Sequence, residues 1–175
     1  MKTIMYPAIS LDGFIAKPDG DSFSWVNQED EARYDEAVKR YGCVLAGHKT
    51  YEEYKEDFHS KKNVVSYICT NSSRADEGNI KFINGTPQEM LNKIEEQGFS
   101  EIIICGGGEI NGLFASAGLV KEIFISIQPV VLGKGIPLFG PHKPMLKLQL
   151  LSTNQDIKGV IQNHYKVINE AGGNR

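Results

Sequence analysis

The chain has 175 residues, of which 41% are apolar, with a formal net charge of -3 and an isoelectric point near 5.8. This length suits one compact domain, and the scattered lysines form no basic surface for nucleic acid or an anionic membrane. Without a signal segment or an apolar run of membrane length, the sequence favours a cytoplasmic protein whose partner is a small molecule.

The first part of the chain alternates between strand and helix patterns. A mostly apolar strand is predicted over residues 3–10, followed by a long loop and a surface helix over residues 28–40 with acidic first turns. Two further strands are predicted over residues 43–46 and 64–69, with a short helix over residues 51–55 between them. Because strands and helices alternate, these strands are expected to be parallel.

A clear helix start follows the next predicted strand, residues 80–83. Thr86 and Glu89 have the spacing of a capping box, and Pro87 occupies the first helical position. Gly98 ends the apolar periodicity, because glycine favours the left-handed conformation that closes a helix. A helix is therefore predicted between these two signals.

The last part of the chain predicts an antiparallel edge to a mainly parallel sheet. A strand pattern covers residues 122–128, and two late strand patterns cover residues 147–151 and 160–167. The predicted fold class is therefore α/β. A single domain is predicted over residues 1–170, and residues 171–175 are expected to be a disordered tail.

Three consecutive glycines are the most informative feature of the sequence. Residues 102–104 are an apolar run typical of a buried strand, residues 106–108 are glycines, and Ile110 begins a helical pattern. Glycines admit a close backbone approach, and a helix start offers unpaired N–H groups, so the junction predicts a pyrophosphate site. The alternative is a tight turn that uses glycine for geometry only. Asn111 and Ser126 stand where the Rossmann fingerprint has glycine and an acidic residue, so another nucleotide fold is predicted.

Loops after three predicted strands share the chemistry of phosphate and ribose contacts. Residues 47–50, 70–73 and 106–109 offer glycines, hydroxyl groups, backbone N–H groups and a cation. In open parallel sheets, ligands bind beyond the carboxyl ends of the strands, so these loops are expected to meet there. Together they favour a dinucleotide ligand.

Metal binding has little support in the sequence. Cys43, Cys69 and Cys105 stand far apart in apolar segments, which is typical of buried free thiols. The histidines have no spacing typical of metal ligands. We therefore expect no metal site.

Four segments carry a resemblance to a known family: residues 10–16, 46–52, 106–110 and 129–139. In order and spacing they resemble the dihydrofolate reductase superfamily, in particular the branch that includes the reductase domain of bacterial riboflavin biosynthesis. The resemblance implies a three-layer α/β/α fold with a mostly parallel sheet and an antiparallel C-terminal edge. It also implies NADPH-dependent hydride transfer to a small heterocycle, similar to 5-amino-6-(5-phosphoribosylamino)uracil reductase or dihydrofolate reductase.

The resemblance also implies which residues contact the cofactor. The first strand and its loop would border the nicotinamide, residues 47–50 and the glycine junction would hold phosphates, and residues 70–72 would lie at the adenosine. The cofactor-binding residues implied in this way are Ala8, Ile15, Ala16, Gly47, His48, Lys49, Thr50, Thr70, Asn71, Ser72, Gly106, Gly107, Gly108, Glu109 and Ile110.

Two positions depart from the family's pattern. His48 stands where many members have arginine, and histidine lacks the planar fork that grips a ribose phosphate, so weak discrimination between NADPH and NADH is expected. Phe14 stands where the riboflavin branch usually has a basic residue, and it cannot hold a substrate phosphate. The phosphorylated aminouracil is therefore a doubtful substrate.

Reduction of a C=N bond places a proton on nitrogen, so an acid is expected near the substrate. Glu31 corresponds by position to the acid of folate-reducing relatives, with Asp30 and Asp35 close by, and the alternative is a solvated helix face. Asp12 lies just beyond the first strand, and the alternative there is an ordinary Asp-Gly turn. Glu31 and Asp12 are the predicted catalytic residues.

A homodimer is expected as well, because late strands of the reductase branch commonly join subunits. Ile123, Ile125 and Ile127 alternate along such a strand, and the alternative is burial in the monomer's own core. Two other functions stay open beside the reductase: a nonenzymatic nucleotide-binding protein, and a structural dimer module without a ligand.

Overall fold

One large sheet organises residues 1–168, the part of the chain that the structure, a computed structural model, describes. Its strands are β1 (Lys2–Met5), β2 (Ala8–Ile9), β4 (Cys43–Gly47), β5 (Val65–Cys69), β6 (Ile80–Ile83), β7 (Glu101–Gly106), β8 (Glu122–Ile127), β10 (Lys147–Asn154) and β11 (Ile161–Ile168). They lie in the order β10-β11-β8-β1-β7-β4-β5-β6, and β2 also pairs with β8. Pairing is parallel from β8 to β6 and antiparallel at β10 and β11. The expected α/β fold with an antiparallel C-terminal edge is confirmed.

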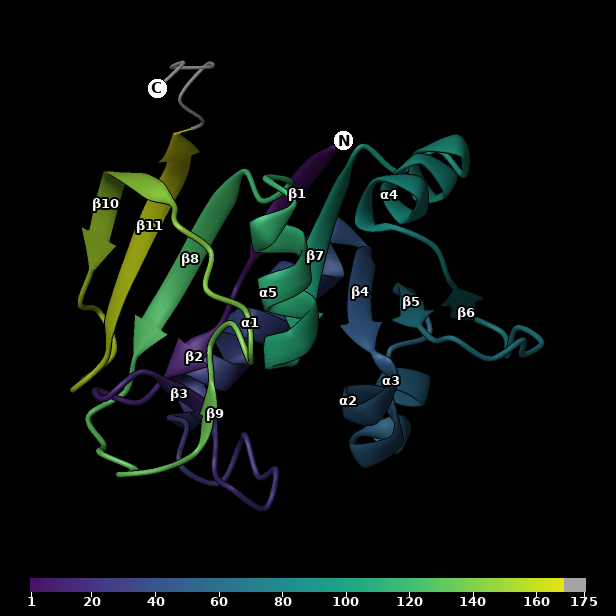
Figure 1. Ribbon diagram of the computed structural model, residues 1–175. Helices are drawn as coiled ribbons and strands as arrows, with labels where there is room; N and C mark the ends of the chain where they lie inside the picture. The colour runs from purple at the N-terminus through teal and green to yellow at the C-terminus, as the bar shows by residue number, and fades with distance from the viewer. Residues whose placement is uncertain (169–175) are drawn as a thin grey trace.

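Helices cover both faces of this sheet (Figure 1). Met90 and Phe114 bring α4 and α5 to one face, and Val38, Tyr51 and Phe58 bring the other three helices to the opposite face. The three-layer arrangement is therefore confirmed, with a buried core on each side of the sheet. The helices are α1 (Gln28–Tyr41), α2 (His48–Glu53), α3 (Lys55–Ser60), α4 (Pro87–Glu96) and α5 (Gly108–Ser116).

The helix starts follow local signals in the sequence. The side chain of Asn27 accepts the Glu29 N–H at 2.8 Å and caps α1. Thr86 and Glu89 form the predicted capping box of α4, each accepting the other's backbone N–H. Gly42, at φ +68°, closes α1 in the left-handed region. The first strand–helix–strand unit therefore begins and ends largely where the sequence predicts.

Three predicted elements differ in the structure. The first predicted strand is interrupted between β1 and β2, where Pro7 has no N–H for the ladder. The predicted short helix is two helices, α2 and α3, which meet at Tyr54. The loop over residues 129–141 contains β9 (Ile136–Pro137), which pairs with β3 (Phe14–Ala16) across the chain. Such long-range pairing has no local signal. The expected tail, residues 171–175, lies outside the described residues.

Two of the isoleucines on β8 that were predicted to join a dimer pack into the core of the monomer itself. Ile123 is 3% exposed and belongs to the core beneath α5, and Ile125 packs against the same core. Their alternation therefore reflects burial in one subunit, and it gives the dimer no support. Strand β10 pairs with β11 alone among the described strands, so its other edge is unpaired. Leu148 and Leu150 are exposed on β10.

We expect a dimer through this open edge, because an exposed strand with apolar side chains is a template for pairing with a second chain. Leu150→Lys should convert the dimer to a monomer, since a charge at the edge opposes strand pairing. The measurement is the molar mass by light scattering at micromolar concentration. Val131→Lys changes an apolar residue that is also exposed, in a distant loop, and should leave the mass unchanged. A monomer mass for the parent protein would contradict the expectation.

Candidate active site

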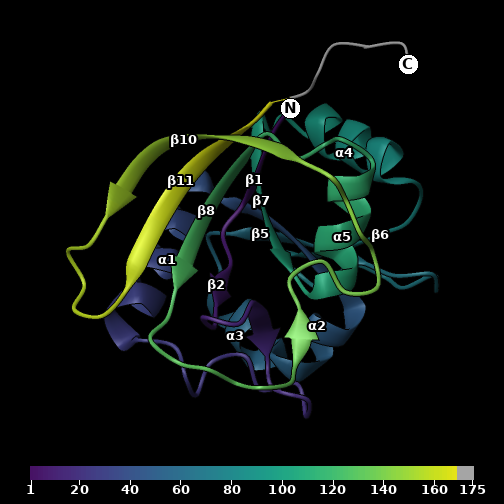
Figure 2. The ribbon, with the colours of Figure 1, turned by 60° about the vertical axis from the view of Figure 1, so that its left-hand side comes forward.

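A cavity of about 1000 Å³ lies at the carboxyl ends of the parallel strands. Strands β4, β5 and β7 end there, and the starts of α2 and α5 and the loops after β3 and β5 line it. Figure 2 shows the loops around β2, β3 and β9 gathered at this end of the sheet. Cavities of this size hold cofactors and small ligands, and this edge of an open sheet is where they bind.

The glycine junction forms one wall of the cavity. Gly106 ends β7 at φ +93°, a conformation that glycine adopts without steric cost, and the peptide bond to Gly107 is cis. The N–H of Gly107 donates to Thr50 Oγ1 at 2.9 Å, so α2 and the junction are tied together. Helix α5 then begins at Gly108, and the N–H groups of its first turn have no partners within the helix. This wall therefore offers backbone donors and a positive helix end to a ligand.

Two glycines let another segment lie directly on α5. A Cβ on Gly108 would stand 2.5 Å from the Pro137 oxygen, and one on Gly112 would stand 2.2 Å from the Phe139 oxygen. Asn111, between them, donates to the Leu138 oxygen at 3.1 Å. Gly108, the third glycine of the junction, and Gly112, inside α5, therefore allow close backbone packing.

The structure brings together nearly all the residues implied as cofactor contacts. Thr70 and Ser72 are joined by a hydroxyl contact of 2.9 Å at the end of β5. Gly106 does not line the cavity, because its Cα faces the Asn111 side chain. The implied residues that line the cavity are Ala8, Ile15, Ala16, Gly47, His48, Lys49, Thr50, Thr70, Asn71, Ser72, Gly107, Gly108, Glu109 and Ile110.

An ion-pair group surrounds the position where the family usually has arginine. His48 Nε2 lies 3.7 Å from a carboxylate oxygen of Glu52, and Nδ1 of His48 is buried without a hydrogen bond to any described residue. Arg74 Nη1 lies 2.8 Å from the same Glu52 oxygen. Position 48 therefore has no guanidinium group, and the guanidinium of Arg74 contacts the same carboxylate as His48. Sequence reasoning missed Arg74 because the contact joins helix α2 to the loop after β5, twenty-two residues apart in the chain.

The structure places Asp12 away from the cavity. Its carboxylate accepts the N–H groups of Leu132 at 3.1 Å and Gly133 at 2.7 Å, and it does not line the cavity. A hydrogen bond with Ser10 and these backbone donors lower the pKa of Asp12. An exposed, hydrogen-bonded carboxylate with a lowered pKa is a poor proton donor at neutral pH. Asp12 instead joins the first loop to the loop after β8, outside the cavity.

Helix α1 brings two carboxylates to the cavity, Glu31 and Asp30. Asp30 is 3% exposed; its oxygens accept the Ser126 hydroxyl at 2.9 Å and the Gln128 amide at 2.8 Å. Burial raises the pKa of Asp30, although these hydrogen bonds and Arg33 oppose the shift. A buried carboxyl group with a raised pKa can hold a proton, so Asp30 fits the expected acid best.

Sequence reasoning did not single out Asp30, because it treated the acidic residues of the first helical turn as one group on the same face. The helical period offers the missing signal: Asp30, Tyr34 and Val38 stand four residues apart, and all three face the sheet side of α1. Glu31 lies one position off this line and is partly exposed. An acid in register with an apolar stripe is a candidate buried residue.

A hydrogen-bond network fixes the Asp30 carboxylate between helix and sheet. Gln128 Oε1 accepts the Asn27 N–H at 3.0 Å, so one buried amide contacts both the helix cap and the carboxylate. Ser126 Oγ also accepts the Gln162 amide at 3.1 Å, and that amide reaches the Tyr6 hydroxyl at 3.0 Å. The network spans α1, β8 and β11. It holds the carboxylate in one position within the cavity wall.

The thiol of Cys105 also lines the cavity. Tyr34 donates its hydroxyl to Cys105 Sγ at 2.8 Å. Burial raises the pKa of Cys105 to about 12, so the thiol stays protonated at neutral pH and is no nucleophile.

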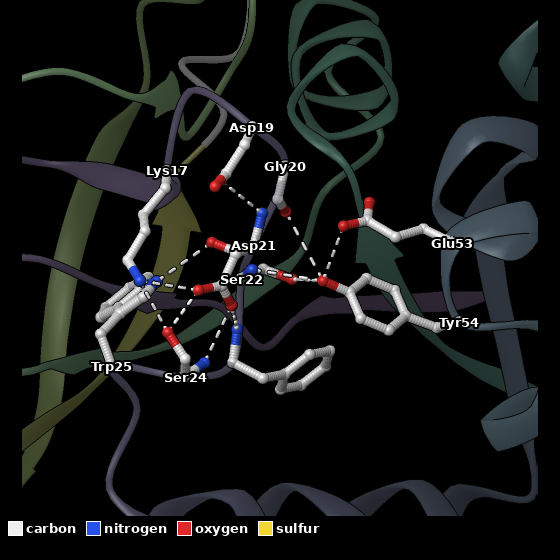
Figure 3. Close-up of polar contacts among 10 residues, drawn as sticks. Lys17, Asp19, Gly20, Asp21, Ser22, Ser24, Trp25, Glu53 and Tyr54 are labelled. Atoms are coloured by element: carbon white, nitrogen blue, oxygen red, sulfur yellow. Dashed lines mark hydrogen bonds and ion pairs between the residues drawn. The ribbon is translucent and has the colours of Figure 1, made fainter.

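The loop over residues 17–26 covers the cavity opposite the sheet. Lys17 Nζ donates to Asp21 and Ser24 at 2.8 Å each, and the lysine lowers the pKa of Asp21 strongly (Figure 3). Tyr54, at the end of α2, meets the Ser22 hydroxyl at 2.8 Å and accepts the Ser22 N–H at 3.2 Å. The phenol also donates to Glu53. These contacts hold the loop against α2.

Phe14 has a different role from the one its sequence position implies. Its side chain packs against Gly135, where an added Cβ would stand 3.1 Å from the ring, and it does not line the cavity. Position 14 therefore belongs to the β3–β9 pairing and lies outside the cavity lining. Whether the cavity accepts a phosphate depends on other residues.

Among residues 1–168, no helix combines the length and the apolar character needed to cross a membrane. In the same range, no three histidine, cysteine or acidic side chains gather as a metal site would require.

The fold is that of dihydrofolate reductase-like proteins. The structure is similar to dihydrofolate reductase from Enterococcus faecalis complexed with NADP(H) and RAB-propyl, with a TM-score of 0.71 and 11% identity over 96% of this chain and 97% of the other. It is also similar to diaminohydroxyphosphoribosylaminopyrimidine deaminase/5-amino-6-(5-phosphoribosylamino)uracil reductase from Thermotoga maritima, with a TM-score of 0.80 and 16% identity. That match covers 95% of this chain and 56% of the other. Both likenesses concern the fold.

Sequence comparison gives the family. The RibD C-terminal domain model matches residues 2–162. The uncharacterized protein YwjB of Bacillus subtilis (strain 168) is 34% identical over 94% of this chain and 97% of its own length. The chain belongs to the RibD C-terminal domain family, as the four sequence segments predict.

The close packing of residues 137–142 on α5 predicts that alanine at position 112 lowers the stability of the fold. Gly112→Ala should lower the free energy of unfolding by about 1 to 3 kcal/mol, because the new Cβ would overlap the Phe139 oxygen. Helix propensity alone predicts the opposite sign, a gain of up to about 1 kcal/mol. Urea unfolding measures the difference. Ser116→Ala, on the exposed end of the same helix, is the control for propensity. A stabilised Gly112→Ala protein would show that the segment over residues 137–142 lies elsewhere.

Proposed function

We propose that this protein is an NADPH-dependent reductase that transfers a hydride to a small nitrogen heterocycle. The observation that carries the proposal is that the glycine junction and a buried carboxyl group, Asp30, line the same cavity. Membership of the RibD C-terminal domain family and the fold shared with two reductases support it. NADPH, when bound, supplies the hydride, and the protein supplies binding, orientation and a proton.

The glycine junction and the start of α2 fit a dinucleotide. The first-turn N–H groups of α5 and the side chains of Lys49 and Thr50 offer donors to phosphate oxygens. A Cβ at Gly107 would touch Thr50 Oγ1 alone, at 3.3 Å, so any longer side chain there would extend into the cavity. The wall therefore accepts a phosphate group only because position 107 has no side chain.

Asp30 is the proton donor in this proposal. The carboxyl group lines the cavity, is buried, and has two fixed hydrogen-bond donors that hold it in place. A proton held on Asp30 would pass to the substrate nitrogen as the hydride reaches the adjacent carbon. Glu31 shares the cavity wall but is partly exposed. The acid is therefore one residue away from the position that sequence counting gives.

NADPH is expected to bind at the glycine junction and to raise the melting temperature. At about one hundred times the dissociation constant, the ligand should stabilise the folded state by roughly 2.7 kcal/mol. Gly107→Val should abolish the shift, because its methyl groups would occupy the phosphate space, while the melting temperature without ligand reports the fold. Thermal-shift titrations with NADPH and NADH measure both. A parent protein that responds to neither cofactor would refute the proposal.

Loss of the Asp30 proton should slow turnover without weakening the binding of the cofactor. Asp30→Asn is expected to lower kcat by 10² to 10⁴, roughly 3 to 5 kcal/mol in activation free energy, for a reducible heterocycle at saturating NADPH. Glu36→Gln, on the exposed face of the same helix, should keep the parent rate. If Glu31→Gln loses the activity and Asp30→Asn keeps it, the donor is Glu31.

The raised pKa of Asp30 also predicts the direction of a stability change with pH. Because the folded-state pKa lies above the unfolded value, the proton stabilises the fold below the unfolded pKa, and this stabilisation is lost as pH rises through the folded pKa. The parent protein should therefore gain stability relative to Asp30→Asn when the pH is lowered through that interval. Denaturant unfolding of both proteins across a pH series measures the difference.

A further inference from the structure

A chain of hydrogen bonds leads from Asp30 to a glutamine outside the cavity. The Ser126 hydroxyl donates to Asp30 Oδ1 at 2.9 Å, and Gln162 Nε2 donates to Ser126 Oγ at 3.1 Å. Asp30 and Ser126 line the cavity, whereas Gln162 does not. Gln162 is 8% exposed, and a buried amide is costly unless it is hydrogen-bonded. The glutamine is therefore placed to act on the carboxyl group through Ser126.

The register of two strands puts Gln162 beside Ser126. In the antiparallel pair of β11 and β8, Gln162 lies directly opposite Ser126, so the two side chains start about 5 Å apart on one face. The neighbouring pair on that face, His164 and Phe124, has stacked rings with centroids 3.8 Å apart. A register shift of one residue would turn Gln162 to the opposite face of the sheet. Strand pairing therefore fixes the amide next to the hydroxyl.

A second contact fixes which part of the Gln162 amide faces Ser126. Gln162 Nε2 also donates to the Tyr6 hydroxyl at 3.0 Å, and the Tyr6 ring stacks on Phe124 with centroids 5.2 Å apart. An amide nitrogen has two N–H groups and accepts no hydrogen bond, so both N–H groups of Gln162 are used. Ser126 Oγ accepts one of them. The single O–H of Ser126 is therefore left to donate to Asp30.

The other oxygen of Asp30 meets a donor whose direction is fixed in the same way. The backbone N–H of Asn27 can only donate, and Gln128 Oε1 accepts it at 3.0 Å. Gln128 therefore turns Nε2 toward Asp30 Oδ2, at 2.8 Å. Both carboxyl oxygens thus accept hydrogen bonds from groups that are held as donors. This arrangement matches an ionised carboxylate, which can only accept.

These fixed donors oppose the effect of burial. Burial raises the pKa of Asp30, and the hydrogen bond from Ser126 counteracts that rise. Hydrogen bonds to a charged oxygen are stronger than those to a neutral one, so the donors gain strength when the proton leaves. A general acid must release its proton as well as hold it. The donors therefore favour the state that follows proton transfer.

We infer that Gln162 is a positioning residue for the proton donor: its amide fixes the direction of the Ser126 hydroxyl, and through Ser126 it favours the carboxylate that Asp30 becomes after giving up its proton. The inference rests on the proposed reductase function, in which Asp30 is the acid. The test replaces none of the other charged and titratable groups around Asp30, which are Glu31, Arg33 and Tyr34 on α1, Cys105 on β7, Asp156 beyond β10 and Tyr6 beyond β1.

The first test is a carbon-13 NMR titration of aspartate carboxyl groups in the protein without cofactor. The Asp30 signal is the one that is absent from the spectrum of Asp30→Asn. Gln162→Met keeps the length of the side chain and removes the amide. We expect its Asp30 signal to titrate at higher pH than in the parent, with a protonation constant increased by about twofold to tenfold, the effect of one hydrogen bond. An unchanged midpoint would overturn the inference.

Two further variants sharpen this titration. Gln149→Met makes the same replacement on the exposed strand β10 and should leave the Asp30 midpoint unchanged. Gln162→Asn shortens the amide side chain by one methylene and serves where Gln162→Met fails to fold, with a rise in the same direction. Equal shifts in Gln149→Met and Gln162→Met would contradict a local effect.

A double-mutant cycle tests the route through Ser126. Ser126→Ala removes the hydroxyl donor and should itself raise the pH at which Asp30 titrates. When Gln162→Met is added to Ser126→Ala, we expect no further shift, because the group that links the amide to the carboxyl is already gone. Additive shifts of the two replacements would show that Gln162 acts by another route and would overturn the inference.

The pH dependence of turnover is the second readout. With a reducible heterocycle at saturating NADPH, the ratio of the Gln162→Met kcat to the parent kcat should rise by about twofold or more across the interval in which Asp30 titrates. The dissociation constant of NADPH should stay unchanged, because Gln162 lies outside the cavity lining. A kcat lowered by the same factor at every pH would indicate a merely structural role and would refute the inference.

The inference and the proposed function fail in different ways. If the NMR midpoint shifts as expected but NADPH neither binds nor is oxidised, the coupling of Gln162 to Asp30 stands and the reductase function is refuted. If turnover depends on Asp30 but Gln162→Met leaves its titration unchanged, the reductase function stands and the inference is wrong.

Discussion

The backbone contact between α5 and the segment over residues 137–142 is the constraint on which the site depends. Gly108 and Gly112 leave the space that the carbonyl oxygens of Pro137 and Phe139 occupy. Through this contact β9 reaches β3, and β3 leads into the loop that covers the cavity. Any side chain at these two glycines would separate the layers. The two glycines therefore fix the glycine junction, the loop over residues 17–26 and the start of α5 relative to one another.

Burial of the Asp30 carboxyl group is the second constraint, and it opposes stability. A carboxylate removed from water is costly, and its hydrogen bonds with Ser126 and Gln128 offset only part of that cost. Yet the same bonds join α1 to β8 and fix the acid in the cavity wall. A buried titratable group that weakens the fold at neutral pH while lining a cavity is typical of a functional site.

The cavity therefore has two chemically different ends in one continuous space. Backbone N–H groups, Lys49 and hydroxyl groups gather where β4, β5 and β7 end, and carboxylates and aromatic rings gather beside α1. An anionic ligand would meet complementary groups at the first of these two ends.

The sequence by itself determined the α/β class, most helix and strand positions, the capping box at Thr86 and the glycine junction, because each has a local pattern of period, cap or turn residue. Tertiary structure alone decided the rest. It separated Asp12 from the cavity, moved Ile123 into the core and buried Asp30 while leaving Glu31 partly exposed. These outcomes depend on which loop or strand a side chain meets across more than ninety residues, and spacing along the chain carries no information about such a contact.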